Sequence, residues 1–159
     1  MKKLIIFAIC LFTMSLAFSQ NIGHIKFMGV EVNGQQSTVE QRLTTKGFTR
    51  TKDNMYKGKF SGYDVKLDLH KSVKSKTIYG ISVVFGKEVT REQLQKMVNS
   101  LKEKYTQGTF FENNEGWRVS TAGIRLPEGM IVMDYDHKTL SYLDNANMDK
   151  DVDESKDDL

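Results

Sequence analysis

Two stretches near the middle of the chain alternate between apolar and polar residues, and this alternation constrains the fold more than any other feature. In residues 63–70 an apolar side chain occupies every second position, from Tyr63 to Leu69. A period of two is typical of a half-buried β-strand. Residues 77–85 repeat the period, which places Tyr79, Ile81, Val83 and Phe85 on one face. The polar turn at 71–76 predicts that the two strands pair as a hairpin.

Two other segments carry helix signals. Ser37 and Glu40 have the spacing of a capping box, and Gly47 marks the end of the helix that they would begin. Thr90 and Gln93 repeat the capping pattern, and apolar residues at helical spacing follow as far as about Tyr105. The sequence therefore predicts one helix before the hairpin and one after it.

Further short strands are expected at 55–60, 109–112, 117–121, 124–126, 130–136 and 139–143. Trp117 shares a face with Val119, so it is expected in the core. The chain thus reads as helix and meander twice, in halves of about 25–86 and 90–143. This order predicts an α+β fold in which the helices pack on one face of an antiparallel sheet.

The N-terminus has the features of a secretory signal peptide. Lys2 and Lys3 precede an apolar run at 4–16, and small residues at 17 and 19 predict cleavage after Ser19. No second long apolar run follows, so no membrane anchor is expected. Cys10 is the only cysteine and lies inside the run, so neither a lipid anchor nor a disulfide is expected after cleavage. The predicted location is periplasmic or extracellular.

Charge is distributed unevenly along the chain. Loss of Lys2 and Lys3 lowers the formal net charge from +3 to +1. Residues 144–159 hold seven acids, beginning with Asp144, and predict a disordered acidic tail after a single domain at 20–143. The segment 42–76 is basic, but Asp64 and Asp68 flank Lys66 on one strand face, so the signal for nucleic-acid binding is weak.

Two resemblances add expectations. The stretch from His24 to Val30, with Asn33-Gly34 and the later Lys46-Gly47-Phe48, resembles the opening of small exported proteins of gut-type Gram-negative bacteria whose function is uncharacterised. The doubled helix-and-meander order is similar to the tandem arrangement of β-lactamase inhibitory protein-like domains. That second resemblance implies partner binding on a concave sheet, as a fold-level analogy.

No residue pattern predicts a cofactor or a metal site. His24, His70 and His137 lack metal-pair spacing and are expected in solvent. Asp149, Asp151 and Asp153 open like an EF-hand loop, but position six is Glu154 instead of glycine. Glu112 and Glu115 flank a predicted turn. Asp134 and Asp136 lie two apart on one strand and are the candidate carboxylates for a hydrolase.

Four apolar residues lie opposite the main apolar face of their predicted strands: Ile78, Val84, Met130 and Val132. A sheet covered by helices on one side normally carries polar residues on the other. This strip predicts burial by the N-terminal segment, a homodimer contact or a surface for a protein or other macromolecule. The leading hypothesis is a non-enzymatic exported binding module that uses the strip. The alternative is a small exported hydrolase that uses Asp134 and Asp136.

Overall fold

The computed structural model describes residues 23–148. The predicted signal peptide and most of the predicted acidic tail lie outside these residues. In chain order the elements are β1 (Lys26–Phe27), β2 (Val30–Glu31), α2 (Gln36–Thr45), β3 (Thr49–Arg50), β4 (Tyr56–Phe60), β5 (Tyr63–Lys71), β6 (Ile78–Phe85), α3 (Arg91–Lys104), β7 (Thr109–Glu115), β8 (Arg118–Leu126), β9 (Gly129–Asp134) and β10 (Thr139–Asp144).

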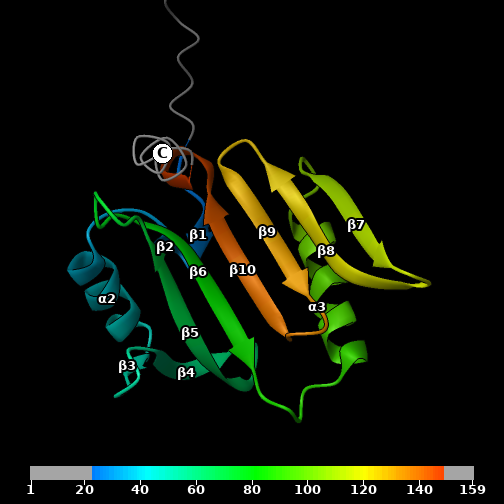
Figure 1. The fold of residues 1–159 in the computed structure, drawn as a ribbon, viewed down its shortest axis with the longest axis horizontal. Helices are drawn as coiled ribbons and strands as arrows, with labels where there is room; N and C mark the ends of the chain where they lie inside the picture. The colour runs from blue at the N-terminus through cyan, green and yellow to red at the C-terminus, as the bar shows by residue number, and fades with distance from the viewer. Residues whose placement is uncertain (1–22, 149–159) are drawn as a thin grey trace, which may run out of the picture.

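Eight of the strands form one antiparallel sheet in the order β3-β4-β5-β6-β10-β9-β8-β7 (Figure 1). Each half contributes a four-strand meander, and the last strands of the two meanders, β6 and β10, pair with each other. Val83 lies opposite Leu140 in this pairing, and Ile81 lies opposite Tyr142. The fold is α+β, as the order of helix and strand signals predicted.

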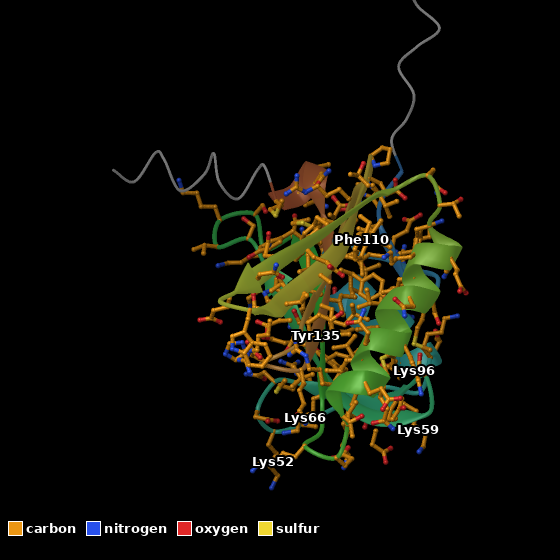
Figure 2. All side chains as sticks on the ribbon, turned by 90° about the vertical axis from the view of Figure 1, so that its right-hand side faces the viewer. Lys52, Lys59, Lys66, Lys96, Phe110 and Tyr135 are labelled. Carbon is orange, nitrogen blue, oxygen red and sulfur yellow. The ribbon has the colours of Figure 1, made fainter. Side chains whose placement is uncertain are left out.

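Within residues 23–148, α2 and α3 each contact side chains of the sheet. The Glu40 carboxylate of α2 accepts a hydrogen bond from the Tyr56 hydroxyl. From α3, Arg91 lies 4.6 Å from the ring centre of Tyr135, and Lys102 lies 3.5 Å from that of Phe110. The strand registers place Tyr56, Tyr135 and Phe110 on one side, which we call the helix face. Figure 2 shows Phe110 and Tyr135 between the sheet and α3.

The hairpin of β1 and β2 also packs on the helix face. Phe27 is fully buried, and its ring centre lies within 6 Å of those of Phe48, Phe60 and Tyr142. The prediction that the N-terminal segment covers the opposite face is therefore wrong for residues 23–32. Burying Phe27 among aromatic rings removes more apolar surface from water than a polar-rich sheet face offers.

One of the two predicted capping boxes forms. The Thr90 hydroxyl accepts from the Gln93 amide, and the Gln93 side chain accepts from the Thr90 amide at the start of α3. The other prediction is wrong, because α2 begins at Gln36, before Ser37, and its N-cap residue Gln35 makes no side-chain cap. The Glu40 carboxylate instead accepts from Gln36 Nε2 at 2.6 Å and from Tyr56.

Trp117 is not in the core. It is 96% exposed and forms a two-residue turn with Gly116 between β7 and β8. Glu115 pairs with Arg118 across this turn, and Gly116 has a φ of 63°, which favours glycine. The register shifts between Asn113 and Asn114. The strand prediction failed here because it began β8 one residue early, inside the turn.

The sheet extends into the predicted tail. Asp144 is the last residue of β10 and has no exposed surface. Its carboxylate accepts from the backbone amides of Ile25 and Asn147. The acidic composition of residues 144–159 led us to place Asp144 in the tail. The hydrogen bonds of Asp144 show instead that it belongs to the folded domain. No helix within residues 23–148 is long and apolar enough to cross a membrane.

Candidate functional site

The side of the sheet opposite the helix face, which we call the open face, is turned toward the viewer in Figure 1, where α3 lies behind β8. Strand register arranges its residues in rows that cross the central strands. The middle row runs Ser82, Ser141, Val132, Gly123 and Phe111 from β6 to β7. The next row runs Gly80, Leu143, Met130, Arg125 and Thr109.

The structure brings together only two of the four predicted strip residues. Met130 and Val132 are half-buried on the open face of β9. Val84 is also half-buried on this face, but its neighbours across the ladders are Lys66 and Thr139. Ile78 has no exposed surface and belongs to the hydrophobic core. Ile78 is therefore removed from the predicted surface.

A β-bulge explains the position of Ile78. His70 pairs with Gly80 and Lys71 pairs with Ile78, so the register skips Tyr79. One extra residue in a strand reverses the face of every residue beyond it. Ile78 consequently turns to the helix face, and Tyr79 turns to the open face, where its ring centre lies 6.0 Å from that of His70. Strict alternation had placed each of them on the other side.

The strand register also places Leu143 and Phe111 on the open face. Neither residue belongs to the strip predicted from the sequence. Leu143 lies opposite Met130, and Phe111 lies opposite Gly123. A Cβ atom on Gly123 would lie 2.8 Å from the Phe111 ring, so the glycine leaves room for this ring beside β8. The sequence could have indicated an aromatic side chain on the open face, because Phe110 and Phe111 are adjacent and adjacent residues of a strand point to opposite faces. We call Met130, Val132 and Leu143 the aliphatic patch.

Hydroxyl groups continue the middle row beside the aliphatic patch. His70 Nε2 lies 2.6 Å from Ser82 Oγ, and Ser82 Oγ lies 2.7 Å from Ser141 Oγ. A histidine beside a serine is the first requirement for a serine nucleophile. Ser82, however, is buried in the middle of β6, where the neighbouring ladders engage the backbone amides that an oxyanion hole would need. The geometry therefore suits a structural hydrogen-bond chain.

Acidic and basic side chains are balanced on the open face. Lys59 of β4 lies 3.2 Å from Asp64 of β5, and Lys66 of β5 lies 3.4 Å from Asp53 in the loop before β4. On β8, Arg125 lies 5.0 Å from the ring centre of Phe111. Lysines that already face carboxylates make a poor binding surface for a polyanion, which is attracted by unneutralised charge. The mixed charge of the open face is complementary to a partner whose surface also carries both positive and negative groups.

Asp134 and Asp136 do not converge on a shared space. The Asp134 carboxylate accepts from the backbone amides of Asp136 and His137 at 3.0 and 2.9 Å and contacts His137 Nδ1 at 2.8 Å. Burial acts to raise the pKa of Asp134, but these hydrogen bonds hold it below its usual value. Asp136 instead pairs with Arg118 at 2.9 Å and with Arg91 at 3.5 Å. Asp134 thus stabilises the turn between β9 and β10, and Asp136 connects that turn to β8 and α3.

The histidines occupy three different settings. His137 is exposed, His70 is part of the hydroxyl chain, and His24 contacts the buried Asp144 carboxylate. The expectation of solvated histidines is therefore right only for His137. Within residues 23–148, no group of three or more His, Cys, Asp or Glu side chains is placed to hold a metal ion. The EF-hand-like aspartates lie outside the described residues. Glu112 and Glu115 are exposed on β7.

Comparison with known proteins identifies no relative: no protein-family model, no curated protein and no solved structure matches the chain.

Proposed function

We propose that this protein is an exported, non-enzymatic binding module that engages another protein through its open face. The observation that carries the proposal is the aliphatic patch, which lies half-exposed in the middle of an eight-stranded sheet. A contiguous apolar patch with a polar rim is typical of a surface that binds another protein.

The surroundings of the patch favour a protein over a nucleic acid as the occupant. The hydroxyls of Ser82 and Ser141 lie at its edge, Arg125 lies opposite Met130, and the ion pair of Lys59 with Asp64 lies farther out on the same face. Protein surfaces carry both signs of charge and match such a rim, whereas nucleic acids require a net positive surface. Phe111 and Tyr79 add aromatic side chains of the kind that anchor protein interfaces.

The alternative of a hydrolase has less geometric support. A general acid needs a carboxyl with a raised pKa, but hydrogen bonds to the turn lower the pKa of Asp134. Asp136 is held between Arg91 and Arg118. If purified protein hydrolysed glycoside or ester substrates, and Asp134→Asn removed that activity, the hydrolase would replace the binding module.

Site-specific photocrosslinking tests the binding proposal. A photoreactive residue at Val132 is expected to crosslink one protein from the exported fraction, whereas the same residue at Asn99, exposed on α3, is expected to give no such product. The captured protein is then purified and its affinity measured. Val132→Asp is expected to weaken binding at least tenfold, because it places a charge where apolar contact forms.

Two controls distinguish the outcomes. Glu103→Gln, at an exposed position on α3 on the other side of the sheet, is expected to leave affinity nearly unchanged. Sedimentation at high concentration tests whether a second copy of this chain occupies the patch. A dimer that Val132→Asp dissociates would overturn the proposal that the partner is a different protein. If Val132→Asp unfolds the protein, the patch is core and the proposal fails.

Export is tested separately. N-terminal sequencing of the exported product is expected to give a sequence that begins at Gln20.

A further inference from the structure

A second candidate site lies on the helix face, independent of the open face. Here a groove of about 410 Å³ separates α3 from the hairpin of β1 and β2. Its apolar lining comes from three directions. The sheet contributes Phe60, Tyr63, Leu140 and Tyr142; α3 contributes Met97, Leu101 and Tyr105; and Met28 lies at the hairpin turn. The volume is in the range of small-molecule sites in proteins.

Lysine side chains surround this lining, and we call the site the lysine-rimmed groove. Lys26, Lys96 and Lys104 line it, and no acidic residue does. Lys96 is paired with Glu92 at 2.9 Å and Lys26 with Glu31 at 3.7 Å, both on the outer surface. Within residues 23–148, no carboxylate lies within ion-pair distance of Lys104, whose ammonium lies 5.1 Å from the ring centre of Tyr105. Lys104 is therefore the lysine of the rim whose charge no described carboxylate offsets, and the three lysines and two carboxylates leave the mouth with a net positive charge.

Tyr142 gives the groove an unused polar group. Tyr142 lines the groove and is only 5% exposed. Within residues 23–148 no hydrogen bond engages its hydroxyl, which is not fully buried and is therefore accessible from the groove. Burial raises the pKa of Tyr142 far above its ordinary value, so the hydroxyl stays protonated. A ligand that accepts a hydrogen bond would satisfy it.

Met28 stands at the mouth at a conformational cost. It is 40% exposed with a φ of 50°, in the left-handed region that a long L side chain rarely adopts. With Gly29 at a φ of 80° it forms the two-residue turn between β1 and β2. Asparagine is the preferred residue at such a position. An exposed methionine in a strained turn beside an apolar groove is consistent with an adaptable ligand contact.

We propose that the lysine-rimmed groove binds a monomeric single-chain amphiphile with an anionic head, such as a fatty-acid carboxylate. The apolar lining receives the chain, and Lys26 and Lys104 at the mouth attract the head. A neutral apolar ligand would leave these lysines unused, and a cationic one would be repelled by them. The apolar lining comes from the sheet, α3 and the hairpin turn, so it encloses a single chain, which favours a free monomer over the surface of a membrane.

Calorimetric titration of the purified protein with three ten-carbon amphiphiles below their micelle concentrations tests the charge preference. Decanoate is expected to bind at least tenfold more tightly than decanol, and decyltrimethylammonium is expected not to bind. Equal affinity for decanoate and decanol would overturn the anionic head, and absence of binding by both would overturn the site. Binding to anionic phospholipid vesicles without binding of decanoate would also overturn the proposal, in favour of a membrane surface.

Variants locate the binding in the groove. Lys26→Gln combined with Lys104→Gln is expected to weaken decanoate binding about tenfold, which corresponds to about 1.4 kcal/mol, and to leave decanol binding nearly unchanged. Lys52→Gln combined with Lys87→Gln, both exposed outside the lining, is the charge-matched control. Ser100→Trp is expected to block the groove from α3, while Asn99→Trp, a neighbouring exposed position outside the lining, is expected not to. Retained binding in Ser100→Trp would contradict the assignment.

Discussion

His24 Nδ1 lies 2.9 Å from Oδ2 of Asp144, a carboxylate without exposed surface, although 120 residues separate the two in the chain. Asn33 Nδ2 contacts the other ring nitrogen of His24 at 2.8 Å. Asn147 Nδ2 donates to Asn33 Oδ1 at 2.8 Å and to Asp144 Oδ1 at 3.1 Å. This network fastens the segment before β1 to the end of β10, so the two ends of the described chain support each other.

Asp144→Ala is expected to lower the free energy of unfolding by about 3 kcal/mol, because it leaves buried amides and His24 without their shared acceptor. Urea denaturation followed by circular dichroism measures the change. Asp64→Ala removes an exposed ion pair with Lys59 and is expected to cost less than about 0.5 kcal/mol. Equal effects of the two substitutions would show that the network contributes no more than a surface pair.

The Asp134–His137 contact is expected to make stability depend on pH. The hydrogen bond from His137 to Asp134 raises the pKa of the histidine, so its contribution is full below the ordinary value of 6.5 and is lost as pH rises through the folded pKa. The pKa of Asp134 is lowered, so its contribution is lost as pH falls through the folded value, below 3.8. His137→Gln is therefore expected to destabilise more at pH 5 than at pH 8.5, in paired thermal melts. A cost independent of pH would contradict this.

Tyr56→Phe tests the link between α2 and the sheet. Burial and the hydrogen bond to Glu40 raise the pKa of Tyr56 to about 12. Burial acts to raise the pKa of Glu40, but hydrogen bonds from Tyr56 and Gln36 hold it below 4.5. Removing the hydroxyl is expected to cost about 1–2 kcal/mol near neutral pH, and the cost should shrink as acid protonates Glu40. Lys96→Gln, which breaks only an exposed pair on α3, is the control in the same denaturation series.

Met28→Asn is expected to change stability and ligand binding in opposite directions. Asparagine tolerates the left-handed turn and should raise the free energy of unfolding by about 1 kcal/mol. The same change removes an apolar contact from the lysine-rimmed groove and should weaken decanoate binding. Thermal melts and calorimetry on one preparation measure both effects. A variant that is less stable than the parent would contradict the strain at Met28.

Trp117 is the only tryptophan of the chain, so its fluorescence reports on one turn. At 96% exposure, its emission is expected to match that of a solvated indole and to be quenched freely by iodide. Addition of decanoate should leave the spectrum unchanged, because Trp117 is not among the residues that line the groove. A blue-shifted, unquenched spectrum for the isolated protein would place Trp117 in an interface or in the core.

Local patterns predicted the elements well. Alternation located β5 and β6, and helical spacing with a capping box located α3, because these signals depend on residues that are close in the chain. Ser37 failed as a cap because Glu40, its partner in the pattern, is engaged by Tyr56 of β4. A tertiary hydrogen bond of this kind has no local sequence signal.

The candidate surface was predicted less completely. Met130 and Val132 lie on the open face as the alternation indicated, whereas the bulge at Tyr79 moved Ile78 into the core. The position of a bulge depends on the partner strand, which a single strand does not encode. The lysine-rimmed groove draws on residues from Lys26 to Tyr142. No spacing rule connects residues so distant, so only the assembled fold reveals it.

The pairing of β6 with β10 has a consequence for how the protein reaches its folded state. Within each meander the hairpins close over short loops, but Val83 meets Leu140 only after the whole second half has been synthesised. Contacts between distant residues cost more chain entropy to form and generally slow folding. Until that pairing forms, β6 and β10 each present an unprotected edge of apolar-rich strand, which is prone to aggregation. The time during which the chain most needs protection therefore ends when these two strands meet.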